Sequence, residues 1–162
     1  MATLKDTLAY MLLKYPYKNE LSNARVTKMV YLADWHHALR AGMQMTNIKW
    51  FYDNYGPFVW DVKDTAEREK SLFRVASSSN YYGSSKCEFE ILDNEYHPTL
   101  VDSERRSLDH VIESTKQLGW DAFIRIVYST YPILSSQRYS YLDLQRKATE
   151  YRQVKRNPQV PV

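Results

Sequence analysis

A metal site is the first chemistry to test in this sequence, at the segment ADWHH. Asp34 and His37 are three residues apart, so they share one face of a helix, and His36 lies beside them. A carboxylate and an imidazole both bind zinc, but a closed site needs four ligands. No spacing brings in His97 or His110 as the missing ones. Because His37 also falls on an apolar stripe, a hydrogen-bonded core histidine is the simpler interpretation, and we predict no metal ligands.

The other groups that could catalyse a reaction are one cysteine and a run of acids. Cys87 lies between Lys86 and Glu88, a setting that offers little to stabilise a thiolate, so we predict a structural cysteine. The acids alternate along one strand edge, which is typical of a solvated face rather than of an acid–base pair; they are Glu88, Glu90, Asp93 and Glu95. The chain has 4 Gly and no Gly-rich phosphate loop. We therefore expect no catalytic residue and no cofactor, and a protein that is not an enzyme.

Length and cysteine content bound the class of protein. The chain has 162 residues and a net charge of +3, which suits one domain. Since Cys87 is the only cysteine, no intrachain disulfide can form, as is typical of the reducing cytosol. No apolar run approaches the roughly 20 residues that span a bilayer. We expect a cytoplasmic protein with no membrane partner, consisting of a single domain at 1–157 and a frayed tail at 158–162.

Positive charge is concentrated near the C-terminus. Between Arg146 and Val162 there are five basic residues and one acid, Glu150. Together with Tyr139, Tyr141 and Tyr151, such a segment could contact and stack on nucleic acid. However, there is no long Lys/Arg block, and two of these tyrosines fall on a predicted buried stripe. We therefore favour a solvated helix end, and keep a nucleic-acid-binding autoregulator as the weaker alternative.

The elements that position these side chains are mostly helical. Ser22 is a good N-cap for the second helix, and Gly42 is well placed to end it in a left-handed conformation. Pro16 ends the first helix, and Pro132 lies in a loop predicted over 129–136. Apolar residues with helical spacing predict helices over about 3–15, 22–41, 57–68, 103–118, 120–127 and 139–153.

Alternation of apolar and polar residues predicts the strands. Residues 46–52 form one short strand, and 72–76 and 86–92 form an antiparallel hairpin with Cys87, Phe89 and Ile91 facing inward. The step Gly56-Pro57 should end the short strand and begin the next helix, because proline fits the first helical turn. The fold predicted is mainly α (α+β), a compact helical domain of about five to six helices with a short strand and a small antiparallel β-hairpin.

The segment from Thr27 to Val62 resembles the Panacea domain, the SocA-like antitoxin family that also includes many phage-associated proteins. The resemblance rests on the pieces YLADW and YGP, and on STYPIL and YSYLDLQRKATEY near the end of the chain. Met29 stands where leucine is common, a volume-conserving change. The matching residues are Lys28, Tyr31, Leu32, Ala33, Trp35, Gly42, Ile48, Trp50, Tyr55, Gly56 and Pro57.

The resemblance implies an antitoxin that neutralises a cognate toxin by direct binding, with no catalytic residue. An alternative that it also implies is a proteolytic adaptor, which delivers the toxin to a housekeeping protease. The 14 Tyr and 4 Trp are residue types enriched where interfaces bind most strongly. The alternative for Trp35 and Tyr55 is that they belong to the family's core. The partner-binding candidates are Asp34, Trp35, His36, Tyr55, Phe58 and Trp60.

Overall fold

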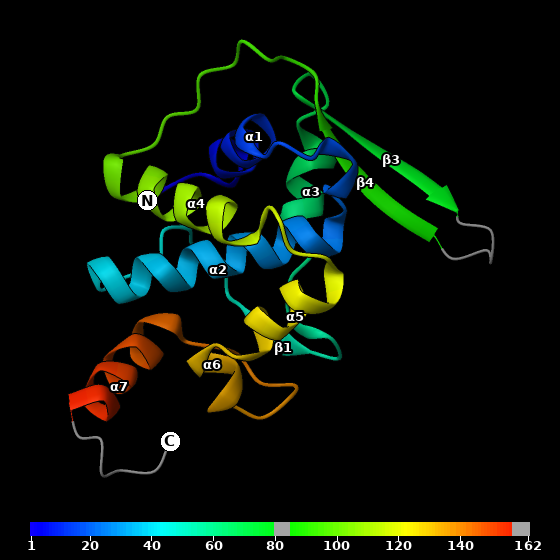
Figure 1. Ribbon diagram of the computed structural model, residues 1–162. Helices are drawn as coiled ribbons and strands as arrows, with labels where there is room; N and C mark the ends of the chain where they lie inside the picture. Colours follow the sequence, from blue (N-terminus) through cyan, green and yellow to red (C-terminus); the bar gives the residue numbers. More distant parts are fainter. Residues whose placement is uncertain (80–84, 157–162) are drawn as a thin grey trace.

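The computed structural model describes residues 1–79 and 85–156 (Figure 1), so the tail predicted at 158–162 lies outside the described residues. Over these ranges the fold is mainly α with two small antiparallel hairpins, which confirms the predicted class. The elements are α1 (Leu4–Lys14), η1 (Lys18–Glu20), α2 (Asn23–Ala41), β1 (Phe51–Asp53), β2 (Gly56–Phe58), α3 (Asp61–Arg68), β3 (Phe73–Ser79), β4 (Ser85–Ile91), α4 (Asp102–Thr115), α5 (Trp120–Tyr128), α6 (Tyr131–Leu134) and α7 (Leu144–Arg156).

Helix α2 is the centre of the molecule. It runs across the middle of Figure 1, with α4 on one side and α7 on the other. The Ser22 hydroxyl accepts a hydrogen bond from the Arg25 amide, and Gly42 ends the helix with φ of 85°. Both caps confirm the sequence prediction, and Met29, Tyr31 and Ala33 are fully buried on different sides of the helix. A helix buried on several sides can hold the surrounding elements in fixed positions.

The Gly-Pro step is part of a strand, so the prediction that it begins a helix is wrong. Gly56 and Pro57 lie in β2, which pairs antiparallel to β1 with Tyr52 opposite Pro57. The following helix, α3, begins at Asp61, and Phe58 is half-buried at the end of the strand.

Two local properties favour the hairpin over the helix. Gly56 has φ of 101°, a conformation that glycine adopts without strain and that closes the turn after Asn54 and Tyr55. Pro57 has no amide hydrogen, but β2 pairs with one neighbour only, and proline is tolerated in such an edge strand. Val62 and Ala66 are buried as predicted.

The second hairpin agrees with the sequence prediction. β3 and β4 pair antiparallel, with Phe73 opposite Ile91 and Val75 opposite Phe89. The hairpin extends away from the helical body in Figure 1. Its base is attached to the body, because the Phe89 amide donates to the Leu21 carbonyl at 2.9 Å.

The segment after α6 differs most from the prediction. Helix α7 begins at Leu144 rather than near Tyr139, because residues 140–142 are extended beside β1. The Tyr52 amide donates to the Ser140 carbonyl at 2.9 Å, and the Leu142 amide donates to the Trp50 carbonyl at 2.8 Å. Tyr141 is therefore not inward as predicted: its side chain is 73% exposed.

Two smaller differences concern helix ends. Residues 131–134 form α6 instead of a loop, with Pro132 in its first turn, where its missing amide hydrogen costs nothing. Helix α4 is capped at Val101, whose amide donates to the Glu104 carboxylate at 2.9 Å, rather than at Asp102 or Ser103.

Within the described ranges, no helix is long and apolar enough to cross a membrane.

Candidate functional site

Asp34 is a buried hydrogen-bond acceptor that joins α2 to residues 45–50. Its Oδ1 accepts from the amides of Met45 and Thr46 at 3.0 and 2.9 Å. Its Oδ2 accepts from the Thr46 hydroxyl at 2.6 Å and from the Trp50 indole at 2.8 Å. Burial raises the pKa of Asp34, and the four hydrogen bonds oppose that rise. The carboxylate is fully buried, so a partner cannot reach it in this structure.

Two neighbours of Asp34 are also structural. Trp35 is buried, with its ring edge-on to Tyr151 at a centroid distance of 6.0 Å. His37 is buried, with Nδ1 at 2.6 Å from the Met43 carbonyl and Nε2 at 3.0 Å from the Ser103 hydroxyl. The interpretation of His37 as a hydrogen-bonded core histidine is confirmed. Among the residues that the structure describes, no three His, Cys, Asp or Glu side chains are arranged to hold a metal ion.

The remaining aromatic candidates lie at the surface around the β1–β2 hairpin. Tyr55 is 80% exposed at the hairpin tip, and Trp60 is 59% exposed. Phe58 is half-buried, and its ring meets that of Trp60 edge-on at 5.0 Å. Sequence reasoning missed Phe51 and Tyr141, whose rings pack edge-on at 5.1 Å on the same surface.

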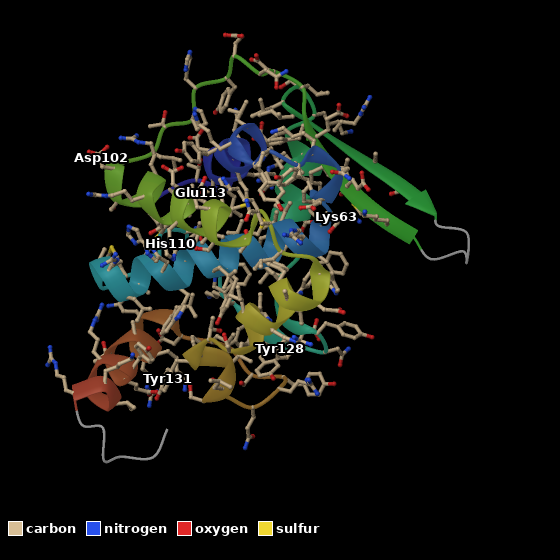
Figure 2. All side chains as sticks on the ribbon, in the orientation of Figure 1. Lys63, Asp102, His110, Glu113, Tyr128 and Tyr131 are labelled. Atoms are coloured by element: carbon tan, nitrogen blue, oxygen red, sulfur yellow. The ribbon has the colours of Figure 1, made fainter. Side chains whose placement is uncertain are left out.

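All of these aromatic residues except Tyr55 line a groove of about 540 Å³, which we call the aromatic groove. Its lining includes both positively and negatively charged side chains. Its aromatic lining is Phe51, Phe58, Trp60 and Tyr141, and the other lining residues are Asn47, Lys49, Asp53, Val59 and Asp61. Tyr128 on α5, labelled in Figure 2, lies against the hairpin: its ring is 3.5 Å from the position that a Cβ at Gly56 would take.

A buried amine lies beneath the aromatic groove. Lys28 on α2 is only 3% exposed, and its Nζ is 5.4 Å from the centroid of the Phe58 ring. Burial lowers the pKa of Lys28 to about 8, and the nearby Asp53 carboxylate limits that fall. Sequence reasoning identified Lys28 only as a matching family residue, since burial of an amine has no local sequence signal.

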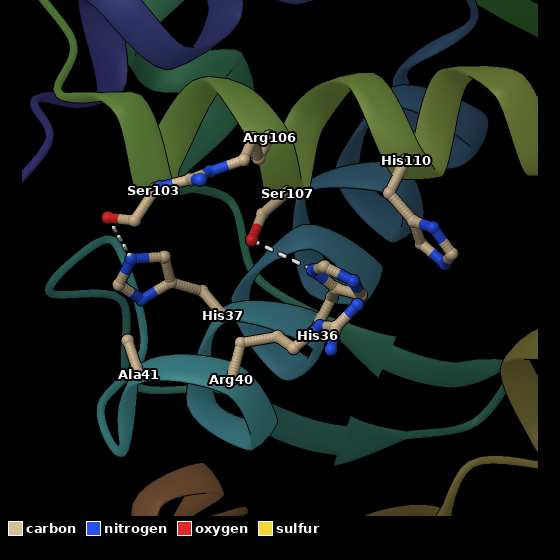
Figure 3. Close-up of a pocket in the computed structure, with 8 residues that line it drawn as sticks. All are labelled: His36, His37, Arg40, Ala41, Ser103, Arg106, Ser107 and His110. Atoms are coloured by element: carbon tan, nitrogen blue, oxygen red, sulfur yellow. Dashed lines mark hydrogen bonds between the residues drawn. The ribbon is translucent and has the colours of Figure 1, made fainter.

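His36 lies in a different hollow, between α2 and α4 (Figure 3), which we call the histidine pocket. Its Nδ1 is 2.9 Å from the Ser107 hydroxyl, and its ring stacks on His110 at a centroid distance of 4.2 Å. Burial, together with the nearby positive charges, lowers the pKa of His36 to about 4. The lining residues are His36, His37, Arg40, Ala41, Ser103, Arg106, Ser107 and His110, around a volume of about 520 Å³.

The six candidates therefore fall into three places. Two are buried residues of α2, one lies in the histidine pocket, and three lie in or beside the aromatic groove. Sequence reasoning did not join His36 to Ser107 or His110, because those residues come from a helix about 70 positions later in the chain.

Comparison with known proteins gives one match. The family model described as "Antitoxin SocA-like, Panacea domain" matches residues 26–132, which run from the first turn of α2 into α6. The matched range is more than half of the chain and includes both hairpins, the buried Asp34 and most of the aromatic groove. The comparisons with curated proteins and with solved structures gave no match. The chain belongs to the SocA-like antitoxin family and carries its Panacea domain.

Proposed function

We propose that this protein is the antitoxin of a toxin–antitoxin pair, and that it neutralises its toxin by direct binding through the aromatic groove. Membership of an antitoxin family supports the general role. The observation that supports the surface is the gathering of four aromatic side chains around one open groove, with Trp60 and Tyr141 largely exposed.

The chemistry of this groove suits a protein partner. Tryptophan and tyrosine carry most binding energy at protein interfaces, and they do so where an apolar ring enters a pocket on the partner. Exposed aromatic residues that adjoin one another are also uncommon on a surface that contacts only water. Lys49, Asp53 and Asp61 supply polar groups of both signs at the edge, which can fix the orientation of a bound partner.

The groove is held in place before any partner arrives. Trp50 precedes β1 directly; its indole donates to Asp34, and its carbonyl accepts from the Leu142 amide. These contacts fix both β1 and the segment that carries Tyr141. A surface that is already ordered loses less conformational entropy on binding, so more of the contact energy appears as affinity.

The reactive groups of the chain support binding rather than catalysis. Cys87 is half-buried, and burial raises the pKa of its thiol, which favours the unreactive protonated form. The Asp34 carboxylate is occupied by four internal hydrogen bonds. We therefore propose that the protein performs no reaction of its own.

The basic residues of α7 give little support to nucleic-acid binding. Arg146 and Lys147 both pair with Glu150, at 3.4 Å. Arg152 donates to the carbonyls of Ala38 and Leu39 at the end of α2. These three cations have partners within the protein, so the charge available for a phosphate backbone is smaller than the sequence suggests.

Coexpression with the product of the adjacent gene tests the proposal. We expect that product to stop growth alone, and this protein to restore growth and to bind it. The double variant Trp60→Ala/Tyr141→Ala should keep its circular dichroism spectrum and fail to restore growth. Trp120→Ala, which changes an exposed tryptophan on α5 outside the groove, is the matched control and should behave as wild type.

Two outcomes would contradict the proposal. One is an adjacent product that is harmless alone or that stays toxic with the wild-type protein present. The other is a double variant that binds and protects like wild type, which would move the interface elsewhere. The half-life of the toxin separates simple masking from delivery to a protease, because only the adaptor shortens that half-life, and a protease-deficient strain should restore it.

A further inference from the structure

We propose that the histidine pocket binds a phosphate-class dianion carried by a small molecule, either orthophosphate or the phosphate group of a nucleotide. The pocket is separate from the aromatic groove and is lined by α2 and α4 alone. Its volume of about 520 Å³ lies within the range of small-molecule sites. The inference does not depend on the proposed antitoxin function.

The pocket carries positive charge without a counter-ion among the described residues. Arg40 and Arg106 line it, and no carboxylate does. The only acid of α2, Asp34, is buried on another side of the helix. Each acid of α4 is directed to another partner: Asp102 to Arg105, Glu104 to the Val101 amide, Asp109 to the Tyr10 hydroxyl, and Glu113 to Lys116.

The neighbouring elements add to this positive potential. From α7, Arg152 donates to the Ala38 and Leu39 carbonyls, and so offsets the negative end of the α2 dipole. Ser103 lies in the first turn of α4, where the helix dipole favours an anion. The cationic side chains that line the pocket itself are Arg40 and Arg106, beside the histidines.

The uncharged side chains of the two helices are joined in pairs by hydrogen bonds across the pocket, Ser103 with His37 and Ser107 with His36. Figure 3 shows Ser103 and Ser107 on one wall and His36 and His37 on the other. The Met43 carbonyl only accepts, so Nδ1 of His37 carries the proton and Nε2 accepts from Ser103 in the neutral ring. Protonated imidazoles and arginines bond phosphate oxygens strongly, because both partners are charged.

The stacked pair of histidines favours an anion over a metal ion. The rings of His36 and His110 are nearly parallel, 20° apart, so their nitrogens do not converge on one point. Two imidazolium rings stacked at this distance repel each other, which adds to the effect of burial in lowering the pKa of His36. A bound dianion would offset this repulsion.

Titration calorimetry on the full chain at pH 7.5, where orthophosphate and AMP are both mainly dianions, tests the proposal, with adenosine as the third ligand. We expect orthophosphate and AMP to bind and adenosine not to bind. If AMP binds at least about tenfold (about 1.4 kcal/mol) more tightly than orthophosphate, the ligand of the pocket is a nucleotide. If the two affinities are equal, the ligand is orthophosphate. In NMR spectra, phosphate should shift the signals of His36 and His110.

Arg106→Gln provides the residue-level test, because Arg106 is exposed and its loss should leave the fold intact. We expect phosphate affinity to fall at least about tenfold, because the variant loses at least one charge-assisted hydrogen bond to the phosphate. Arg125→Gln on α5 is the matched control, and should bind as wild type. Absence of binding by both phosphate ligands, equal affinity in Arg106→Gln, or shifts confined to other histidines would overturn the proposal.

Discussion

Two tryptophans ten residues apart, Trp50 and Trp60, have opposite environments. Trp50 is fully buried, packs edge-on against Tyr31 at 5.4 Å, and donates its indole hydrogen to Asp34. Trp60 is mostly exposed, and in the described part of the chain no acceptor for its indole is present. Both lie close to the β1–β2 hairpin. Trp50 holds the hairpin in place, whereas Trp60 is exposed at its surface.

The difference shows how to distinguish residues that stabilise the fold from residues that are free to contact a partner, within one family motif. A residue whose polar atoms all have internal partners contributes to the fold, as Asp34 and Trp50 do. A large side chain that is exposed and rests on other aromatic rings is available to a partner, as Trp60 is. Variants on the two sides of this division should therefore change different measured quantities.

Asp34→Ala should have the largest effect. It leaves four buried donors without an acceptor, and each unsatisfied group costs about 1–3 kcal/mol. We expect the free energy of unfolding, measured with urea, to fall by more than about 3 kcal/mol. Asp61→Ala, an exposed acid beside the groove, should change it by less than about 0.5 kcal/mol. Equal losses in the two variants would remove the distinction between the two regions.

Lys28→Met should stabilise the protein by about 2 kcal/mol at pH 7. The native pKa of about 8 lies below the ordinary 10.5, so below pH 8 both states are protonated and the folded state bears the whole cost of burying the charge. Between pH 8 and 10.5 the native amine loses its proton first, and this cost disappears. The gain over wild type should therefore shrink as pH rises through this window, as urea denaturation at pH 7, 9 and 10.5 would measure. A gain that is absent at pH 7, or that stays constant with pH, would show that the buried charge is not the cause.

Trp60→Ala should affect binding and not folding. Because most of the side chain is already in water, we expect the free energy of unfolding to change by less than about 1 kcal/mol. Affinity for the toxin should fall at least tenfold, or about 1.4 kcal/mol, as measured by calorimetry. If the variant is strongly destabilised but binds the toxin normally when folded, Trp60 has a structural role, as Trp50 does.

Gly56→Ala should have the smallest effect, about 1 kcal/mol on stability. At φ of 101° any residue with a Cβ is strained, while the nearest atom to that Cβ would be the Tyr128 ring at 3.5 Å, an ordinary contact. The cost therefore comes from the backbone, and Gly56→Asn should lose less because asparagine tolerates positive φ better. Thermal denaturation of both variants measures the order, and equal losses would point to Tyr128 rather than to backbone strain.

The sequence alone determined several local features of the chain, although not the Gly56-Pro57 step. Ser22 and Gly42 set the ends of α2, and the alternation of Cys87, Phe89 and Ile91 predicted β4. These signals work because caps, periodicity and pleating depend on residues a few positions apart. The family motif at YLADW and YGP is equally local, and the match over residues 26–132 confirms it.

The tertiary structure alone decided which motif residues are exposed and which residues share a site. Tyr141 is exposed because residues 140–142 pair with β1, almost 90 positions earlier in the chain. Asp34 is enclosed because the segment from Met45 to Trp50 folds back over α2, and His36 meets Ser107 because α4 packs there. Pairings between distant segments decide burial, and burial decides whether a side chain of a given type stabilises the fold or remains free for a partner.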